Sequence, residues 1–373
     1  MSPILPNAAK VRVLIVDDSI VVRKILSDTL SASTDPAIEV VSSAHDGKIA
    51  LAKIPLCNPD LITLDIEMPV MNGLETLVQV RKLYPKLPVI MFSTLTERGA
   101  AATLDALSLG ASDYATKPSN TGSPAAAIDR VREELIPKIK ALCTFDKLPA
   151  RTRRPEPMSR AAFPKRSRRI DIVAIGTSTG GPNALAEVFP AIPKNFPVPI
   201  VTAQHMPPIF TRLLAERLCS HSQISVEEAR GGERLSAGHA WIAPGNFHMT
   251  VMRDKMDAVL VINQDPPEHS CRPAVDVLFR SVAANFGSGT LAVVMTGMGS
   301  DGVEGAKLIR EAGGEVIVQD EASSVVWGMP GLTYASGLAD AVYPLRQLGQ
   351  EIVRRVLQSR ALAPPLQPRS QAV

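Results

Sequence analysis

Alternation of short apolar runs with helical stretches most constrains the fold of this chain. Between residues 11 and 143, five runs are each followed by a helical pattern: VRVLIV, IEVVSSA, DLITLD, PVIMFS and SDYAT. The apolar residues of the last helical stretch recur at intervals of three and four, on one face: Ile128, Val131, Leu135, Ile139 and Leu142. Five strands alternating with helices predict a doubly wound parallel sheet, with ligand sites beyond the carboxyl ends of its strands.

A second alternating region extends from residue 170 to 357. Its strand-like runs are IDIVAIG, PVPIVTAQ, LAVVMTG and GEVIVQD, and short β signals crowd the segment between the second and third (ISVEEA, HAWIAPG, HMTVMR, AVLVI). We predict a second doubly wound, mainly parallel sheet with a small antiparallel insertion. The predicted N-terminal domain is then 1–143, the second domain 170–357, and the remainder, 358–373, a disordered tail.

The segment between the two domains, 144–169, has a different composition. KLPARTRRPEPMSRAAFPKRSRR contains nine Lys and Arg residues against one Glu, together with four prolines. Such a segment buries too little apolar surface to fold alone, which predicts an exposed linker. A nucleic-acid-binding arm is the alternative, but no aromatic pattern accompanies the charge, so a hinge that touches an acidic surface is favoured.

Composition narrows the class of protein. The chain has 373 residues, a hydrophobic content of 45% and a net charge of only +3, which does not argue for nucleic acid as a partner. Its four cysteines form no C-x-x-C pair, and no run reaches the length of a membrane span. We expect a cytoplasmic protein of two domains, without direct membrane insertion.

Acidic, hydroxyl and lysine side chains follow the strands of the first domain. Asp17 and Asp18 follow the first run, Asp65 ends the third, Ser93 ends the fourth and Lys117 follows the fifth. At one sheet edge the three carboxylates would repel one another unless a hard cation such as Mg²⁺ held them. Asp65 could then attack a phosphoryl group, with Ser93 and Lys117 contacting its oxygens.

This pattern resembles the receiver domain of bacterial response regulators over residues 11–120. The shared features are DD after the first strand, D-x-x-M-P (Asp65, Met68, Pro69), the hydroxyl after the fourth strand and K-P after the fifth. The resemblance implies that a histidine kinase phosphorylates Asp65. It also implies a switch aromatic at Tyr114, and a Mg²⁺ site formed by Asp17, Asp18, Asp65 and the backbone carbonyl of Glu67.

The second domain offers the parts of a nucleophilic triad. IDIVAIG leads into GTSTGGP with Ser178 on a glycine-rich turn, PVPIVTAQ leads into His205, and LAVVMTG leads into Asp301. In parallel strands these side chains share one edge, and a triad is defined by geometry rather than by chain order. No Cys/His cluster or H-x-x-x-H is present, so we expect no metal or other cofactor in this domain.

The stretch TGMGSDG also spells G-x-G-x-x-G, the dinucleotide-binding fingerprint. A pyrophosphate would dock on the helix N-terminus behind these glycines. Asp301 lies in the same loop and would compete with phosphates for the amides, whereas a carboxylate is stable there and could orient a histidine. We therefore favour the triad, with a nucleotide- or DNA-binding output domain as the alternative.

GTSTGG, QHMP and TGMGSDG together resemble the chemotaxis protein-glutamate methylesterases over most of residues 171–345. The resemblance implies hydrolysis of glutamate methyl esters on the cytoplasmic domain of chemoreceptors, and many members also deamidate receptor glutamines. By motif, Ser178 is the nucleophile, His205 the general acid and base, and Asp301 its orienter. Backbone amides of Thr179 and Met298 would form the oxyanion hole. Two departures are Thr177, where Ala is frequent, and Cys271, where the family often has His.

Overall fold

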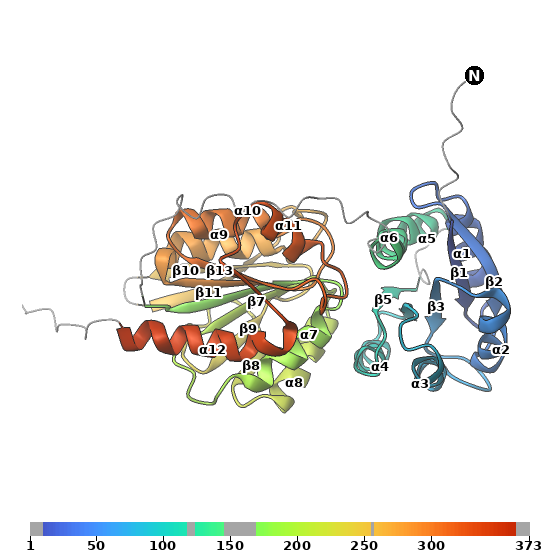
Figure 1. Ribbon diagram of the computed structural model, residues 1–373, viewed down its shortest axis with the longest axis horizontal. Helices are drawn as coiled ribbons and strands as arrows, with labels where there is room; N and C mark the ends of the chain where they lie inside the picture. The colour runs from blue at the N-terminus through green and yellow to red at the C-terminus, as the bar shows by residue number, and fades with distance from the viewer. Residues whose placement is uncertain (1–9, 118–123, 145–168, 255–256, 363–373) are drawn as a thin grey trace, which may run out of the picture. The chain divides into compact units, whose positions relative to one another are not determined.

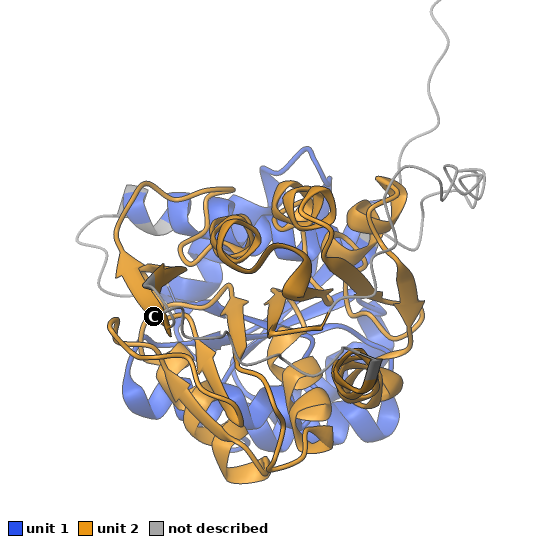
Figure 2. Ribbon diagram, turned by 90° about the vertical axis from the view of Figure 1, so that its left-hand side faces the viewer, with its two compact units in different colours: residues 1–154 blue, residues 155–373 orange. Residues whose placement is uncertain are grey.

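The computed structural model describes residues 10–117, 124–144, 169–254 and 257–362. The chain divides into two compact units, residues 1–154 and 155–373 (Figure 2). Most of the predicted linker and the end of the predicted tail lie outside the described residues. Each unit is considered by itself.

The first unit contains a five-stranded parallel sheet in the order β2-β1-β3-β4-β5. Its strands are β1 (Val11–Val16), β2 (Ile38–Ala44), β3 (Leu61–Asp65), β4 (Val89–Ser93) and β5 (Asp113–Thr116). Its helices are α1 (Ile20–Ser31), α2 (Gly47–Cys57), α3 (Gly73–Leu83), α4 (Glu97–Ser108), α5 (Pro124–Arg130) and α6 (Ile136–Thr144), with the π-helical η1 (Val131–Leu135) between the last two. Helices α1, α5 and α6 cover one face of the sheet, and α2, α3 and α4 cover the other (Figure 1).

The fold of this unit follows from the predicted pattern. Val131, Leu135 and Ile139, on the predicted face of the last helical stretch, belong to one buried cluster with Val13 and Ile15 of β1. Each of α1 to α4 begins directly after a polar cap whose side chain accepts a backbone N–H: Ser19, Asp46, Asn72 and Thr96. The helices therefore start just beyond the carboxyl edge of the sheet and leave that edge open to a site.

The second unit contains a seven-stranded sheet in the order β14-β13-β12-β6-β7-β9-β8, with every neighbouring pair parallel. Its strands are β6 (Ile172–Thr177), β7 (Ile200–Gln204), β8 (Ser225–Glu228), β9 (His239–Ile242), β12 (Thr290–Val294), β13 (Glu315–Gln319) and β14 (Ala341–Tyr343). A separate antiparallel ribbon is formed by β10 (His248–Asp254) and β11 (Asp257–Asn263).

Helices cover both faces of the larger sheet. The helical elements are α7 (Gly181–Val188), η3 (Phe189–Ala191), α8 (Phe210–His221), α9 (Val275–Phe286), η4 (Gly287–Gly289), α10 (Val303–Glu311), α11 (Met329–Ala335) and α12 (Leu345–Leu362). Helices α9, α10 and α11 lie on one side, and α7, α8 and α12 lie on the other (Figure 1). The predicted doubly wound architecture of both units is confirmed.

Two details differ from the sequence-based expectations. Of the short runs expected in the antiparallel insertion, β10 and β11 pair antiparallel, whereas β8 and β9 extend the main sheet in parallel. The predicted boundary at residue 357 falls inside α12, which continues to Leu362 and whose Ser359 hydroxyl accepts the backbone N–H of Ile170 at 3.0 Å. The first residues of the predicted tail are therefore helical.

Candidate active site

Strand order brings the three predicted triad residues to one edge of the larger sheet. Strand β6 lies between β12 and β7, with Gly176 opposite Val294 and Thr177 opposite Gln204. Ser178 follows β6, His205 follows β7, and the loop after β12 carries Asp301. The chain therefore leaves three adjacent parallel strands at the same level, where their side chains can meet.

Ser178 is held on a tight turn between β6 and α7. Its backbone N–H donates to the carbonyl of Thr296 at 3.0 Å, and its carbonyl accepts from the Gly181 amide at 2.8 Å. Gly180 has a φ of +78°, a conformation that a residue with a Cβ adopts only at a cost. The Gln204 side chain donates to the Ser178 carbonyl at 3.0 Å. These contacts present the hydroxyl at the sheet edge.

His205 bridges the other two residues. Its Nδ1 lies 3.1 Å from Ser178 Oγ, and its Nε2 lies 2.7 Å from Asp301 Oδ2. An ionised Asp301 can only accept, so Nε2 carries the hydrogen and, in the neutral ring, Nδ1 faces Ser178 as an acceptor. Burial alone would lower the pKa of His205, but its hydrogen bonds with Asp301 and Cys271 raise that pKa from 6.5 to about 10.

The Asp301 carboxylate lies at the N-terminus of α9. Oδ2 accepts the amide of Val275 at 2.7 Å, and Oδ1 accepts the amide of Asp276 at 2.8 Å. Burial alone would raise the pKa of Asp301, but the His205 hydrogen bond and these amides lower it. The sequence predicted a helix N-terminus for this acid, yet the amides belong to α9 rather than to α10, which begins two residues later.

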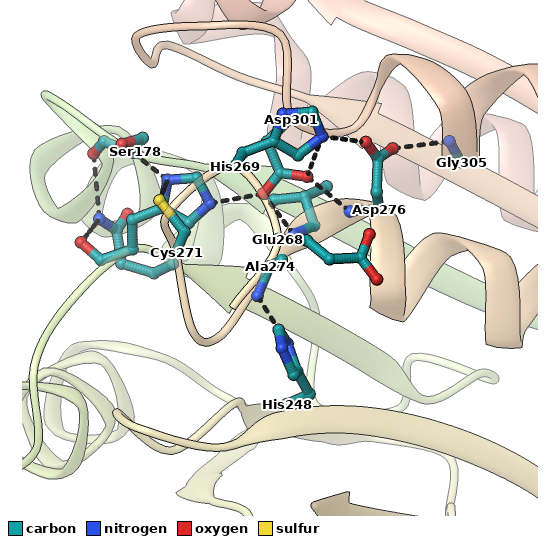
Figure 3. A network of polar contacts seen from close by, with 12 residues as sticks. Ser178, His248, Glu268, His269, Cys271, Ala274, Asp276, Asp301 and Gly305 are labelled. Atoms are coloured by element: carbon teal, nitrogen blue, oxygen red, sulfur yellow. Dashed lines mark hydrogen bonds and ion pairs between the residues drawn. The ribbon is translucent and has the colours of Figure 1, made fainter. Parts of the chain in front are cut away.

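A second polar layer lies behind the first and was not predicted as part of the site (Figure 3). His269 Nε2 lies 2.9 Å from Asp276 Oδ2 and 3.9 Å from Asp301 Oδ1. The Gly305 amide donates to the other oxygen of Asp276 at 2.6 Å. The side chains of His269, Asp276 and Asp301 lie close enough together to bind a cation. However, each of the four carboxylate oxygens already has a hydrogen-bond donor.

Cys271 was noted in the sequence only as a departure, and it lies in direct contact with the site. Its Sγ is 3.4 Å from Nδ1 of His205. The family resemblance over residues 171–345 includes the segment around Cys271 but did not mark it as part of the site. Nothing in the spacing indicated that it would fold back onto the triad, because the contact spans 66 residues of chain.

The loop after β12 approaches Ser178 closely, beside the amides predicted to form an oxyanion hole. A Cβ on Gly297 would lie 2.9 Å from Ser178 Cβ and 3.1 Å from Ser178 N. Thr179 follows Ser178 on its turn and Met298 follows Gly297 in the loop. Both residues predicted to form the oxyanion hole therefore adjoin this close approach, and that role stays a prediction.

The carboxyl edge of the smaller sheet brings a lysine between two buried acids. Lys117 Nζ lies 2.6 Å from Asp65 Oδ2 and 3.2 Å from Asp17 Oδ2. The side chains of Asp17 and Asp65 are almost fully buried, and burial raises the pKa of both. For Asp65, burial and the nearby Asp17 raise the pKa from 3.8 to about 6 despite Lys117. The site therefore holds more negative charge than one lysine offsets.

The same edge has a donor set suited to a hard cation. Carboxylate oxygens of Asp17, Asp18 and Asp65 lie within 4.8 Å of one another. Asp18 is exposed, whereas Glu67 directs its side chain to Arg98 at 3.6 Å, which leaves its backbone as the part near Asp65. All-oxygen ligands with excess negative charge are what Mg²⁺ prefers, so these residues fit the predicted ion.

The two remaining residues predicted for the smaller domain are both buried. Ser93 is buried and its hydroxyl donates to the Gly99 carbonyl at 3.0 Å. Tyr114 is also buried, which raises the pKa of its phenol, and Lys138 Nζ lies 4.7 Å from its ring centroid. The predicted switch aromatic therefore faces inward.

No helix among the described ranges is long and apolar enough to cross a membrane. Two family models match the chain: the response regulator receiver domain over residues 13–129, and the CheB methylesterase over residues 173–352. Each match spans one of the two parallel sheets described above.

Curated relatives match along nearly the full length. A protein-glutamate methylesterase/protein-glutamine glutaminase of Trichodesmium erythraeum is 53% identical, covering 93% of this chain and 99% of its own. Proteins of the same name from Nocardioides sp. and Pyrococcus abyssi are 49% and 42% identical, covering 94% and 93% of this chain and 96% and 94% of their own. The alternative of a nucleotide- or DNA-binding output domain is thus not supported, and the chain belongs to the family of receiver-containing protein-glutamate methylesterases/protein-glutamine glutaminases.

Proposed function

We propose that this protein hydrolyses γ-methyl esters of glutamate side chains on chemoreceptors, releasing glutamate and methanol, with Ser178, His205 and Asp301 as its catalytic residues. One observation carries the assignment: His205 contacts Ser178 Oγ through one ring nitrogen and Asp301 through the other, at 3.1 and 2.7 Å. The names of the relatives supply the substrate class. A side chain on another protein is a suitable substrate for an acyl-transfer site at a sheet edge.

The geometry supports a two-step mechanism. Ser178 Oγ attacks the ester carbonyl while Nδ1 of His205 takes its proton, and amides near Thr179 and Met298 stabilise the oxyanion. The tetrahedral intermediate then expels methoxide, which leaves as methanol with the proton from Nδ1. Water, activated by the same nitrogen, hydrolyses the acyl-enzyme. Asp301 keeps the hydrogen on Nε2 and stabilises the imidazolium in both steps.

The same constellation supports deamidation of glutamine side chains. Attack on an amide carbonyl gives the same acyl-enzyme and releases ammonia instead of methanol. Ammonia leaves only after nitrogen is protonated, and the protonated Nδ1 of His205 is placed to supply that proton. The relatives' double name, methylesterase and glutaminase, supports this second activity.

The receiver domain supports control by phosphorylation. We infer that Asp65 accepts a phosphoryl group from a chemotaxis histidine kinase, with Lys117 and the Ser93 hydroxyl contacting the phosphoryl oxygens. Mg²⁺ bound by Asp17, Asp18, Asp65 and the Glu67 carbonyl would neutralise charge on the transferring group. A cavity of about 680 Å³ lined by Asp18, Glu67 and Arg98 offers room beside these acids for the phosphodonor. Kinase, receptor domain and enzyme would meet in the cytoplasm.

Release of methanol from methyl-labelled receptor membranes tests the catalytic assignment. The full-length protein, phosphorylated in the presence of Mg²⁺, should release labelled methanol. Ser178→Ala removes the attacking oxygen and should lower kcat by about 10⁴- to 10⁶-fold while the fold remains intact. Circular dichroism serves as the folding control. A variant that keeps more than a tenth of the wild-type rate would show that Ser178 is not the nucleophile.

A further inference from the structure

The Cys271 thiol shares a nitrogen of His205 with Ser178. Nδ1 lies 3.4 Å from Cys271 Sγ and 3.1 Å from Ser178 Oγ. Nε2 is engaged by Asp301, so Nδ1 is the only ring nitrogen that either group can use. The neutral ring has a single lone pair there and accepts a proton from one partner at a time. The two side chains are therefore competitors for one base.

The position of Cys271 is set by its surroundings. Glu268 and Cys271 exchange two backbone hydrogen bonds, at 3.1 and 2.8 Å, across a tight turn. Both central residues of this turn, His269 and Ser270, have positive φ. Arg280 contacts the Glu268 carboxylate, and Arg272 donates to the carbonyl of Gln264 and to Asn246. Anchors on both sides hold the thiol against the ring.

The Cys271 thiol and the Ser178 hydroxyl differ in acidity, and the more acidic group gives up its proton to Nδ1 more readily. A thiol has an ordinary pKa of about 8.5, whereas an alkyl hydroxyl does not ionise in the range where proteins are stable. Asp301 strengthens His205 as a base, which favours transfer from sulfur to Nδ1 and an ion pair of thiolate and imidazolium. That ion pair leaves Nδ1 protonated and unable to accept the proton of Ser178.

We propose that Cys271 is a positioning residue that acts through His205: it draws the shared base into an ion pair and so sets the pH range in which Ser178 is active. The proposal rests on the function proposed above for Ser178 and His205. The pKa of His205 is raised above its ordinary value of 6.5, and the hydrogen bond with Cys271 is among the causes, which agrees with this proposal. Among the described residues, the other charged or titratable groups at or behind the ring are Asp301, His269, Asp276, Glu268, Arg280 and His248.

Two substitutions separate the proton of Cys271 from its volume. Cys271→Ala removes the thiol, and Cys271→Ser keeps a hydrogen-bonding group that does not ionise at the pH values used. In both, the acidic limb of kcat/KM for methanol release should move to lower pH by about one unit or more. The rate on that limb changes about tenfold per pH unit, so it should rise by about tenfold or more. Cys219→Ala, which alters another half-buried cysteine on α8, should keep the wild-type profile.

Alkylation gives a readout that does not depend on hydrolysis. Iodoacetamide reacts with the thiolate, whose sulfur forms a bond to carbon while iodide leaves with the electron pair of the broken bond. In the full-length protein at pH 7, mass spectrometry should show Cys271 labelled faster than Cys219. His205→Ala should slow the labelling of Cys271 about tenfold and leave Cys219 unchanged, because it removes the group that stabilises the thiolate.

The outcomes are distinct. Unchanged acidic limbs in both Cys271 variants, or labelling of Cys271 that ignores His205, would overturn the proposal. A fall in kcat without a shift of the limb would assign Cys271 a packing role instead and would also overturn it. If the wild type released no methanol while His205 still controlled labelling, the proposed function would fail and the pairing of thiol and imidazole would stand.

Discussion

At the scale of single residues, Asp301 shows how one carboxylate serves structure and chemistry together. It accepts two amides of α9 and the Nε2–H of His205, so its charge is needed at both places. Asp301→Asn keeps the shape but places an amide NH₂ among hydrogen-bond donors and favours the wrong histidine tautomer. We expect kcat to fall by up to about 10⁴-fold. Steady-state methanol release measures it.

A contrary result is equally specific. If Asp301→Asn hydrolysed ester normally and instead lost binding of a dinucleotide in a titration, the glycine pattern of TGMGSDG would be a nucleotide loop. The buried position of Asp301, which is 1% exposed and already bonded to three donors, argues against that outcome.

Asp65 gives a pH-dependent prediction. Its pKa is raised to about 6 by burial and by Asp17, so the folded state carries a destabilising charge above that pH. The cost is absent below the ordinary value of the unfolded chain, 3.8, where both states are protonated. Asp65→Asn removes the charge and should raise the melting temperature at pH 7.5 without Mg²⁺, and by less at pH 5. Thermal unfolding in EDTA at the two pH values measures this.

A gain that was equal at both pH values would mean that volume or hydrogen bonding, not charge, separates the variant from the wild type. Asp18→Asn is a suitable comparison, because Asp18 belongs to the same cluster but is exposed to solvent. It should change the melting temperature little.

At the scale of elements, the loop from β12 to α10 can approach Ser178 closely because residue 297 is a glycine and has no Cβ, although its φ is not positive. A Cβ on Gly297 would meet Met329 Sδ at 2.3 Å as well as the backbone of Ser178. Gly297→Ala should therefore push the loop away from Ser178 and lower kcat by about 10²-fold, since displacements of about 1 Å in a site have that effect. The measurement is kcat together with thermal unfolding.

Gly232→Ala is the matched control for this substitution. Gly232 has a φ of +92° and open space around its Cβ position, so alanine there strains the backbone without contacting the site. We expect a loss of about 1–2 kcal/mol in stability and an unchanged kcat. If both variants lost activity in proportion to stability, the close approach of Gly297 to Ser178 would not matter to catalysis.

The sequence predicted where individual strands lie better than it predicted how those strands pair. The strands that end at Asp65, Ser93 and Gln204 were predicted almost to the residue, because apolar runs buried on both faces are a strong signal. The sequence of a strand does not determine which strand it pairs with. The short β patterns of β8 and β9 are equally suited to an antiparallel ribbon, and only tertiary contacts place these strands in parallel. For the same reason the contacts of Asp301 with α9 and of Cys271 with His205 could not be predicted.

At the scale of the whole molecule, each unit has its own sheet and its own buried cluster. The proposed phosphorylation site and the proposed triad lie in different units, so control of one by the other requires the units to communicate. A charge added at Asp65 would lie beside Lys117 and opposite Phe92 on the strand that ends at Ser93, and these groups can reorder the adjacent surface. We propose that the resting receiver restrains access of a protein-sized substrate to Ser178.

Three proteins test this restraint by initial rates of methanol release. A fragment beginning at residue 165 lacks the receiver and should be more active than the resting full-length protein. Asp65→Asn should stay at the resting rate even with kinase and Mg²⁺, because the amide cannot accept a stable phosphoryl group. Phosphorylated wild type should approach the fragment. Equal rates for fragment and resting protein would rule out restraint by the receiver, and recruitment to the receptor through the receiver would then be the better explanation of why phosphorylation matters.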